Sequence, residues 1–416
     1  MTLSEELSWR GFLGQTTLSN ITELDKNSYR FYWGVDPSSD SLTVGNLATA
    51  MMVKHFINYG HQAFLLVGGA TGMIGDPDGK SEERSMLSIR DIKRNKQSIT
   101  QQYQRLFNRN HIEIVDNYDW FKNYDYLDFL REVGKHVPLS QMLGREFVQT
   151  RLGQEGNGIS YAEFSYVLIQ AYDFYHLHNR YGVNLQVCGA DQWGNSIAGV
   201  ELIRRLSGDN AQVWACPLVV NPQTNVKFGK TEEGAIWLDP TKTSPTAFYQ
   251  FWVNADDSTV DSYLKLFTML DKESISKIIE RHFAHSKLRL AQYKLADEVT
   301  AIVHGSPAAE LARSVTEFLV GSRSIGSASR KQLDTLRNEI PSAKAAVDSP
   351  IVLALVTSGL AASNTAARKL LKDGAIYIDN KTIDRENFVN SDFTNGRLLL
   401  RRGKAYKDSA LIELVS

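Results

Sequence analysis

The sequence FYWGVDPSSDSLTVGNLATA, residues 31–50, decides the fold of this chain. Its first five residues are mostly aromatic or β-branched and predict a short buried strand. The strand ends at Asp36, because Pro37 lacks an N–H group and the serines after it favour turns. A helix is predicted from near Thr43, where apolar residues begin to recur at helical spacing. Such a helix start presents free N–H groups and the positive end of the helix dipole, which suit a phosphate. Gly45 in the first turn has no side chain, so another group can approach the backbone closely there.

The bulk composition is that of an ordinary globular chain long enough for two or three domains. It has 416 residues, of which 43% are hydrophobic and 22% are charged, and its net charge is −1. This charge argues against indiscriminate nucleic-acid binding over the whole surface. Cys188 and Cys216 form no C-x-x-C pair, which fits a reducing compartment, and we expect a cytoplasmic location without a signal peptide or a membrane span.

Two further segments carry clustered cations. Residues 227–231, KFGKT, place two lysines around a glycine, and residues 75–81, GDPDGKS, lead to Lys80 and Arg84. The second segment is not a P-loop, because the position five before its second glycine is Ile74 rather than glycine. Taken alone, each segment is more typical of a solvated surface loop.

Together, these segments resemble the paired signatures of class I aminoacyl-tRNA synthetases, the HIGH motif (here TVGN, 43–46) and the KMSKS motif (here KFGKT). VGGATGMIGDPDGK at 67–80, EFSYVLIQAYDF at 163–174 and QVCGADQWGN at 186–195 are similar to the tyrosyl-tRNA synthetases of bacteria. The resemblance runs from the first residues to the C-terminus. It implies an enzyme that activates L-tyrosine with ATP to tyrosyl-adenylate and pyrophosphate, and then transfers tyrosine to the 3′ end of tRNA(Tyr).

Alternating short strands and helices predict a parallel α/β sheet with its ligands at the carboxyl ends of the strands. With the resemblance, this implies a Rossmann-like catalytic domain at 1–243, a helical anticodon-binding domain at 244–320, a linker with some helix at 321–349 and a small α+β S4-like RNA-binding domain at 350–416. The last segment holds ten basic and seven acidic residues. The RNA-binding residues expected on its second helix are Arg368, Lys369 and Lys372.

Polar residues gather in the segments that carry the resemblance. Tyr166, Gln170 and Asp173 stand at i, i+4 and i+7 of a predicted helix, hence on one face, which is more often a solvated face than a binding site. Asp191 and Gln192 follow a predicted strand at 185–187, where polar groups face a ligand in such sheets.

The resemblance assigns roles to individual residues. The residues that read tyrosine are Tyr32 and Asp173 at the phenol hydroxyl, Asp76, Tyr166 and Gln170 at the ammonium, and Gln192. The residues on the ATP side are Gly34, Asp36, Gly45, Gly189, Asp191 and Lys230. The catalytic residues are Thr43, Asn46, Lys80, Arg84, Lys227 and Lys230.

The implied chemistry needs no enzyme nucleophile, because the attacking group is the carboxylate of tyrosine. Catalysis is then positioning together with stabilisation of charge on the phosphate oxygens, for which lysine is well suited. Mg²⁺ is expected to be held mainly by the ATP phosphates rather than by a protein metal site. The resemblance also implies a homodimer whose interface includes part of residues 90–160 and the helix that follows them.

Two departures from the family pattern concern the nucleotide side of the site. The two histidines of the HIGH motif are replaced by Thr43 and Asn46, so the imidazolium charge is lost and a hydroxyl and an amide remain as donors. Trp33 is bulky for a residue beside the adenosine site.

Three alternatives remain. A tryptophanyl-tRNA synthetase is disfavoured by Tyr32 and Asp173, which suit a hydroxyl rather than an indole N–H group. An RNA-binding or splicing-support protein on a synthetase scaffold that has lost its chemistry is supported only by the altered motif at Thr43. A nucleotidyltransferase with an HxGH-type helix gives no reason for the S4-like C-terminal segment.

Overall fold

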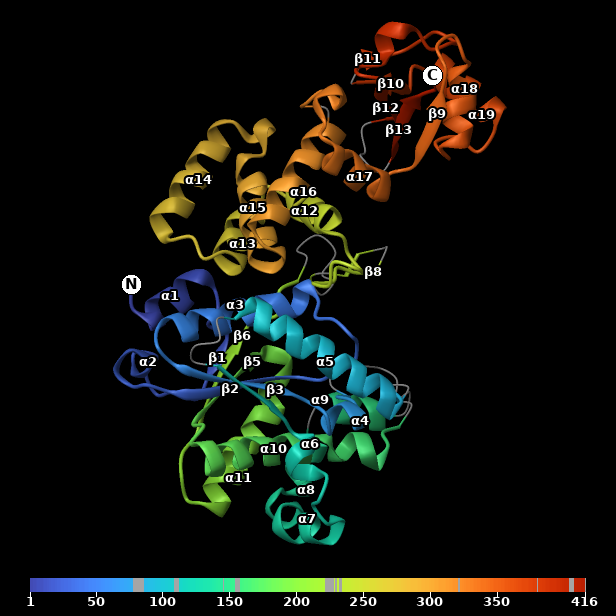
Figure 1. The fold of residues 1–416 in the computed structure, drawn as a ribbon. Coiled ribbons are helices and arrows are strands. Elements are labelled where there is room, and N and C mark those ends of the chain that lie inside the picture. Colours follow the sequence, from blue (N-terminus) through green and yellow to red (C-terminus); the bar gives the residue numbers. More distant parts are fainter. Residues whose placement is uncertain are drawn as a thin grey trace. The chain divides into compact units, whose positions relative to one another are not determined.

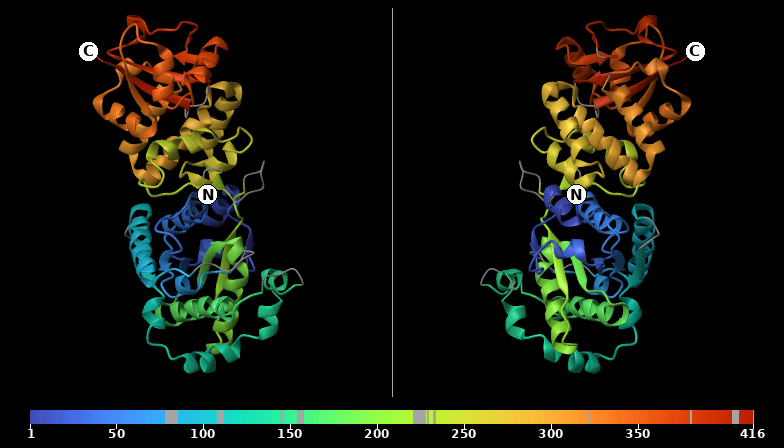
Figure 2. Two further views of the ribbon diagram at one scale, coloured as in Figure 1. Left: turned by 90° about the vertical axis from the view of Figure 1, so that its right-hand side faces the viewer. Right: turned by 90° about the vertical axis from the view of Figure 1, so that its left-hand side faces the viewer.

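The computed structural model describes residues 1–77, 86–107, 112–144, 146–153, 158–220, 228, 230–231, 234–320, 322–379, 381–403 and 408–415 (Figures 1 and 2). They form two compact units, Met1–Thr243 with Asp256–Ala291, and Ser244–Ala255 with Gln292–Ser416. Among the described helices, none has the length and apolar composition that crossing a lipid bilayer requires.

The first unit is built on a six-stranded sheet in the order β1-β6-β5-β2-β3-β4. All neighbouring pairs are parallel except β1 and β6, which are antiparallel. The strand order reverses between β2 and β5, so a crevice opens at their carboxyl ends, where ligands bind in such sheets. The strands are β1 (Gln15–Thr16), β2 (Arg30–Val35), β3 (Gln62–Val67), β4 (Ile112–Asp116), β5 (Leu185–Gly189) and β6 (Gln212–Cys216). The predicted strands at 31–35, 64–67 and 185–187 are therefore confirmed, whereas β1, β4 and β6 were not predicted.

Helices cover both faces of this sheet, because alternate strand residues point to opposite sides. On β2, the ring of Phe31 packs on Phe56 of α3 at 5.2 Å between centroids, and that of Trp33 packs on Tyr103 of α5 at 5.4 Å. Tyr32 points the other way and packs on Phe174 of α10 at 5.1 Å. The helices of these layers are α3 (Val44–Asn58), α5 (Ile89–Leu106), α10 (Tyr161–Tyr181) and α11 (Trp193–Leu206). The predicted Rossmann-like α/β architecture is confirmed.

Smaller elements complete the first unit. They are the helices α1 (Leu3–Arg10), α2 (Glu23–Lys26), α4 (Thr71–Ile74), α6 (Tyr118–Phe121), α7 (Tyr126–Glu132), α8 (Leu139–Leu143), α9 (Glu146–Leu152), α13 (Val260–Phe267) and α14 (Lys272–Ala284), and the hairpin β7 (Lys230–Thr231) with β8 (Gly234–Ala235).

Helix α13 belongs to the first unit, although the sequence predicts that it lies in the helical domain at 244–320. The buried guanidinium of Arg10 donates to the carbonyl oxygens of Lys265 at 2.7 Å, Thr268 at 3.0 Å and Leu270 at 2.6 Å. Glu6 pairs with the same guanidinium at 2.6 Å, so the buried charge is compensated. These bonds satisfy carbonyls at the end of α13 and attach it to α1.

The second unit combines helices with a five-stranded sheet in the order β11-β10-β12-β13-β9. Its strands are β9 (Ser342–Ala345), β10 (Ile376–Ile378), β11 (Lys381–Thr382), β12 (Arg397–Arg402) and β13 (Ser409–Leu414). Its helices are α12 (Pro245–Val253), α15 (Leu290–His304), α16 (Ser306–Leu319), α17 (Arg330–Glu339), α18 (Ile351–Thr357) and α19 (Asn364–Lys372). The predicted pair of helices and the predicted hairpin after residue 350 are confirmed.

Both faces of this sheet are covered. On one face Leu398, Leu400 and Ile412 share a core with α18 and α19. On the other, Leu399 and Leu411 share a core with α16 and α17. The segment 321–349, expected to be a linker with some helix, thus contributes α17 to a core and β9 to the sheet. The sequence did not indicate this role, because Ser342–Ala345 is short and polar and forms a strand only by pairing with β13.

We expect Leu411→Ala to lower the free energy of unfolding by about 2–5 kcal/mol, because it empties space in a core that α16, α17 and the sheet share. Urea unfolding of the intact protein, followed by circular dichroism, measures the change. Leu353→Ala on α18 is the matched control, since its side chain is 53% exposed, and it should change the free energy by less than about 0.5 kcal/mol. Equal effects of the two substitutions would contradict the shared core.

Candidate active site

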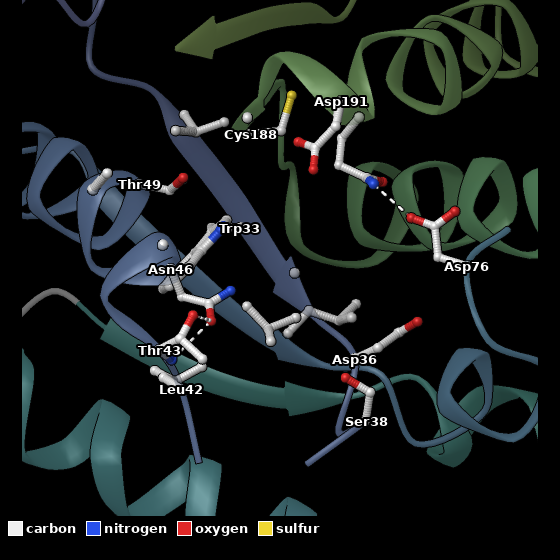
Figure 3. Close-up of a pocket in the computed structure, with 18 of the residues that line it drawn as sticks. Trp33, Asp36, Ser38, Leu42, Thr43, Asn46, Thr49, Asp76, Cys188 and Asp191 are labelled. Atoms are coloured by element: carbon white, nitrogen blue, oxygen red, sulfur yellow. Dashed lines mark hydrogen bonds between the residues drawn. The ribbon is translucent and has the colours of Figure 1, made fainter. Parts of the chain in front are cut away.

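A cavity of about 600 Å³ opens at the strand-order reversal of the first unit, between the carboxyl ends of β2 and β5 (Figure 3). It brings together most of the residues that the sequence singled out. These are Tyr32, Gly34, Asp36, Thr43, Gly45, Asn46, Asp76, Tyr166, Gln170, Asp173, Gly189, Asp191 and Gln192.

The N-terminus of α3 and a distant segment meet at one wall of this cavity. The backbone N–H of Val44 donates to the carbonyl of Ile236 at 3.0 Å, and that of Leu238 donates to the carbonyl of Leu42 at 2.9 Å. Phe228, from the predicted cationic segment, also lines the cavity, and a Cβ atom on Gly45 would lie 3.4 Å from its carbonyl oxygen. The group that approaches the backbone of Gly45 closely is therefore the carbonyl of Phe228.

Thr43 and Asn46 are bonded to each other at the start of α3. The Oδ1 atom of Asn46 accepts hydrogen bonds from the backbone N–H and from the hydroxyl of Thr43, both at 3.0 Å (Figure 3). Because both donors need an acceptor, Oδ1 faces Thr43 and the amide nitrogen of Asn46 faces the cavity. The donor that this helix start offers to a ligand is thus Asn46, whereas the hydroxyl hydrogen of Thr43 is already used.

Asp173 on α10 is a buried carboxylate held by two donors. The amide of Asn117 donates to Oδ2 at 3.0 Å and the indole N–H of Trp120 donates to Oδ1 at 2.9 Å. Burial nevertheless raises the pKa of Asp173 to about 8, since desolvation outweighs the two hydrogen bonds. No lysine or arginine pairs with Asp173 in the described part of the chain, so its charge depends on these donors and on a ligand.

Three buried polar atoms at the cavity have no hydrogen-bond partner among the described residues. They are Oη of Tyr32, Oε1 of Gln170 and Oε1 of Gln186. Buried polar atoms are normally paired, because leaving one unpaired costs about 1–3 kcal/mol. Their gathering here indicates a polar ligand that supplies the missing partners.

Other polar residues of the cavity are linked across elements. Asp36 accepts from the hydroxyl of Tyr166 at 2.8 Å and from that of Thr71 at 2.6 Å. Asp76 accepts from the side-chain amide of Gln192 at 2.6 Å. These links join β2, α4 and α10 around one end of the cavity, which thereby carries two carboxylates and favours a cationic group.

Gly189 and Asp191 lie where β5 ends. A Cβ atom on Gly189 would stand only 2.6 Å from Oδ1 of Asp191, so glycine is needed for the carboxylate to fold back over the strand end. Trp33 lines the cavity but is only 4% exposed, since its indole packs on Tyr103. Its bulk is therefore accommodated mainly by the layer under β2.

Other expected site residues do not line this cavity among the described residues. Lys80, Arg84 and Lys227 lie outside the described residues, as does the side chain of Lys230, whose backbone belongs to β7. Arg368, Lys369 and Lys372 are exposed on α19, in the second unit.

The structure adds residues that sequence reasoning missed, namely Asn117, Trp120 and Gln186. Gln186 carried a signal, because it is a polar residue inside an apolar strand. Asn117 and Trp120 follow β4 at the carboxyl end of the sheet, so predicting that strand would have drawn attention to them.

Comparison with known proteins identifies the class of this fold and site. The family model "tRNA synthetases class I (W and Y)" matches residues 24–320, and the model "Tyrosine--tRNA ligase SYY-like C-terminal domain" matches residues 332–407. The chain therefore has the fold of the class I synthetases for tryptophan and tyrosine.

Similar sequences narrow the class. The tyrosine--tRNA ligase of Bacteroides thetaiotaomicron is 38% identical over 97% of this chain and 98% of the relative. Those of Flavobacterium johnsoniae and Staphylococcus haemolyticus are 40% identical, each over 97% of both chains. This chain belongs to the tyrosine--tRNA ligase family. The resemblance drawn from the sequence is confirmed, and a tryptophanyl-tRNA synthetase is disfavoured.

Solved structures agree with the fold. A C-terminally truncated mitochondrial tyrosyl-tRNA synthetase from Aspergillus nidulans superposes with a TM-score of 0.69 at 29% identity, covering 76% of this chain and 94% of that chain. A tryptophanyl-tRNA synthetase from Encephalitozoon cuniculi reaches 0.54 at 13% identity over 75% of this chain and 89% of that chain, which shows a shared fold alone.

We expect Trp120→Phe to reduce discrimination between tyrosine and phenylalanine by about 5- to 30-fold, because it leaves Oδ1 of Asp173 without its donor. Pyrophosphate exchange with each amino acid gives the ratio of kcat/KM values. Trp9→Phe on α1 makes the same change away from the cavity and should leave the ratio unaltered. An unaltered ratio in Trp120→Phe would show that Trp120 does not position Asp173.

The raised pKa of Asp173 predicts a pH dependence of stability. Between its ordinary value of 3.8 and about 8, the folded protein keeps a proton that the unfolded chain releases. This contribution is complete below the lower value and is lost as the pH rises through the higher one. The free energy of unfolding should thus fall by a few kcal/mol between about pH 4 and about pH 8, and Asp173→Asn should flatten this slope. Urea titrations at several pH values check it, and equal slopes in the two proteins would contradict the assignment.

Proposed function

We propose that this protein is a working tyrosine–tRNA ligase, which forms tyrosyl-adenylate from L-tyrosine and ATP and then charges tRNA(Tyr). The observation that carries the proposal is the shared cavity. It combines the buried Asp173 for a phenol, Asp76 for an ammonium and a helix N-terminus for a triphosphate.

Tyr32 and Asp173 read the phenol hydroxyl in this proposal. The substrate hydroxyl donates to Asp173 and accepts from the unpaired Oη of Tyr32. Phenylalanine leaves both groups unsatisfied in a buried place, which is costly. Selection of tyrosine over phenylalanine by this enzyme class is a known example of such discrimination.

The other end of tyrosine lies between Asp76, Tyr166 and Gln170, whose oxygen atoms accept from the ammonium, with Gln192 beside it. Oε1 of Gln170 has no partner among the described residues, as an ammonium acceptor requires. The carboxylate of tyrosine then faces the α-phosphorus of ATP.

The nucleotide occupies the wall formed by Gly34, Asp36, Gly45, Gly189 and Asp191. The helix N-terminus and the amide of Asn46 bind phosphate or ribose oxygens. Lys227 and Lys230, with Lys80 and Arg84, bring the positive charge that stabilises the reacting phosphates; these four residues enter from the sequence resemblance.

Mg²⁺ enters this proposal as a companion of the triphosphate, because its preferred ligands are phosphate oxygens and water. When bound with ATP, it neutralises charge on the phosphates. The chain's own groups position the tyrosine carboxylate and the α-phosphorus for in-line attack, with pyrophosphate leaving.

Residues 350–416 act as an S4-like RNA-binding domain, with Arg368, Lys369 and Lys372 presented to tRNA on α19. All three side chains are exposed on one short helix, as phosphate contacts require. The chain functions as a homodimer whose interface includes part of residues 90–160 and the helix that follows. Large apolar side chains are exposed there: Tyr118, Tyr126, Leu127, Leu139, Leu152 and Tyr161. A cytoplasmic location agrees with Cys188 and Cys216, which are both free thiols.

Tyrosine-dependent exchange of pyrophosphate into ATP tests the function. We expect exchange with tyrosine, none with tryptophan, and transfer of tyrosine to tRNA(Tyr). Absence of exchange with intact tRNA binding would favour the alternative of an RNA-binding protein on a synthetase scaffold.

We expect Asn46→Asp to lower the rate of exchange by about 100-fold while preserving the fold. One carboxylate oxygen still accepts from Thr43, and the negative charge at the helix start is favourable by about 0.3–1 kcal/mol, but the other oxygen now repels the phosphates. Exchange kinetics and thermal melting measure the two effects.

Asn58→Asp, at the other end of the same helix, is the matched control and should keep full activity. Full activity in Asn46→Asp would remove Asn46 from the phosphate site.

A further inference from the structure

Helix α5 carries an unusual outer face. Its inner face is buried through Ile92, Ile99, Tyr103 and Leu106. Its outer face is exposed, and Figures 1 and 2 show the helix at the outside of the first unit. The exposed polar residues of the helix are Arg90, Lys93, Arg94, Gln97, Gln101, Gln104 and Arg105.

Among the described residues, the charge of this helix is only partly compensated, since Lys96 pairs with Asp116 and Arg94 with the one carboxylate of the helix. Residues 89–106 contain five cations and a single carboxylate, in a chain whose net charge is −1. That carboxylate, Asp91, pairs with Arg94 at 3.1 Å. Among the described residues, neither Arg90 nor Lys93 nor Arg105 forms an ion pair. A solvated helix face usually mixes both signs, as Lys277 with Glu273 on α14 illustrates.

The same helix forms a wall of the active site. Ile99 lines the cavity, and the amide of Asn95 donates to the carbonyl of Pro37 at 3.0 Å. The side-chain oxygen of Gln102 accepts from the backbone N–H of Leu42 at 2.8 Å. The helix therefore holds a wall of the cavity with one face and carries its exposed cations on the other.

We propose that the outer face of α5 binds the phosphate backbone of tRNA near its acceptor end, which must enter the cavity to be charged. This inference rests on the proposed function. Lysine, arginine and glutamine side chains are the donors that phosphate and ribose oxygens take. The face has no exposed aromatic side chain for stacking and, apart from Ile89 at its first position, no exposed apolar one, so it suits neither base reading nor a protein partner. Binding by this face is thus independent of sequence and sensitive to salt.

The triple variant Arg90→Gln, Lys93→Gln and Arg94→Gln tests the proposal, since glutamine is also a good helix former. We expect weaker binding of tRNA(Tyr), and a slope of log affinity against log salt that is shallower by roughly 0.7–0.9 for each phosphate that the variant no longer neutralises. Tyrosine-dependent pyrophosphate exchange needs no tRNA and should be unchanged.

Two controls separate position from charge. Arg90→Lys, Lys93→Arg and Arg94→Lys keeps every charge on the face and should keep the wild-type slope. Lys93→Gln should weaken binding and flatten the slope, whereas Lys26→Gln, which removes an exposed lysine on α2, should do neither.

An unchanged affinity and slope in the triple variant would overturn the proposal, as would an equal effect of Lys26→Gln. If the triple variant also loses exchange, its fold is affected, and the single variant Lys93→Gln decides in the same assay. Absence of exchange in the wild-type protein would refute the proposed enzyme activity instead, and the salt slopes of tRNA binding would still test the α5 face.

Discussion

The active site depends on the pairing of residues 42–44 with residues 236–238, two segments far apart in the chain. The hydrogen bonds of Val44 with Ile236 and of Leu238 with Leu42 fix the start of α3 against the segment that follows KFGKT. Backbone bonds of this kind are obligatory for buried peptide groups, so they set the geometry without regard to side-chain identity. Thr43, Gly45 and Asn46 consequently line one cavity together with Phe228, the residue of KFGKT whose side chain the structure describes, even though the family histidines are absent.

The second constraint is the carboxylate of Asp173. Burying a charge is unfavourable, and the two neutral donors offset only part of this cost, so the pKa of Asp173 is raised to about 8. The two donors therefore hold Asp173 in one position, and its oxygen atoms can still form a hydrogen bond with a ligand. Oη of Tyr32, which has no partner among the described residues, lines the same cavity, so both groups can still bond to a ligand.

The second unit shows how a small sheet becomes part of a larger body. Leu399 and Leu411 face away from the core of α18 and α19 and share a core with α16 and α17. Since both faces of the sheet are apolar, neither can be left to solvent. The segment 350–416 is in this way joined to the preceding helices by packing rather than by a free linker.

The sequence by itself determined the α/β class, the strand at 31–35, the start of α3 and the family, because these depend on local periodicity and on motifs read in order. It also placed Tyr166, Gln170 and Asp173 on one helix face. Only the tertiary structure decided what that face meets, which strands complete the sheet and that α13 joins the first unit. The physical reason is that β4, β6 and β9 are defined by their neighbours, and that partners such as Asn117 and Trp120 for Asp173, or Arg10 for the end of α13, come from distant parts of the chain.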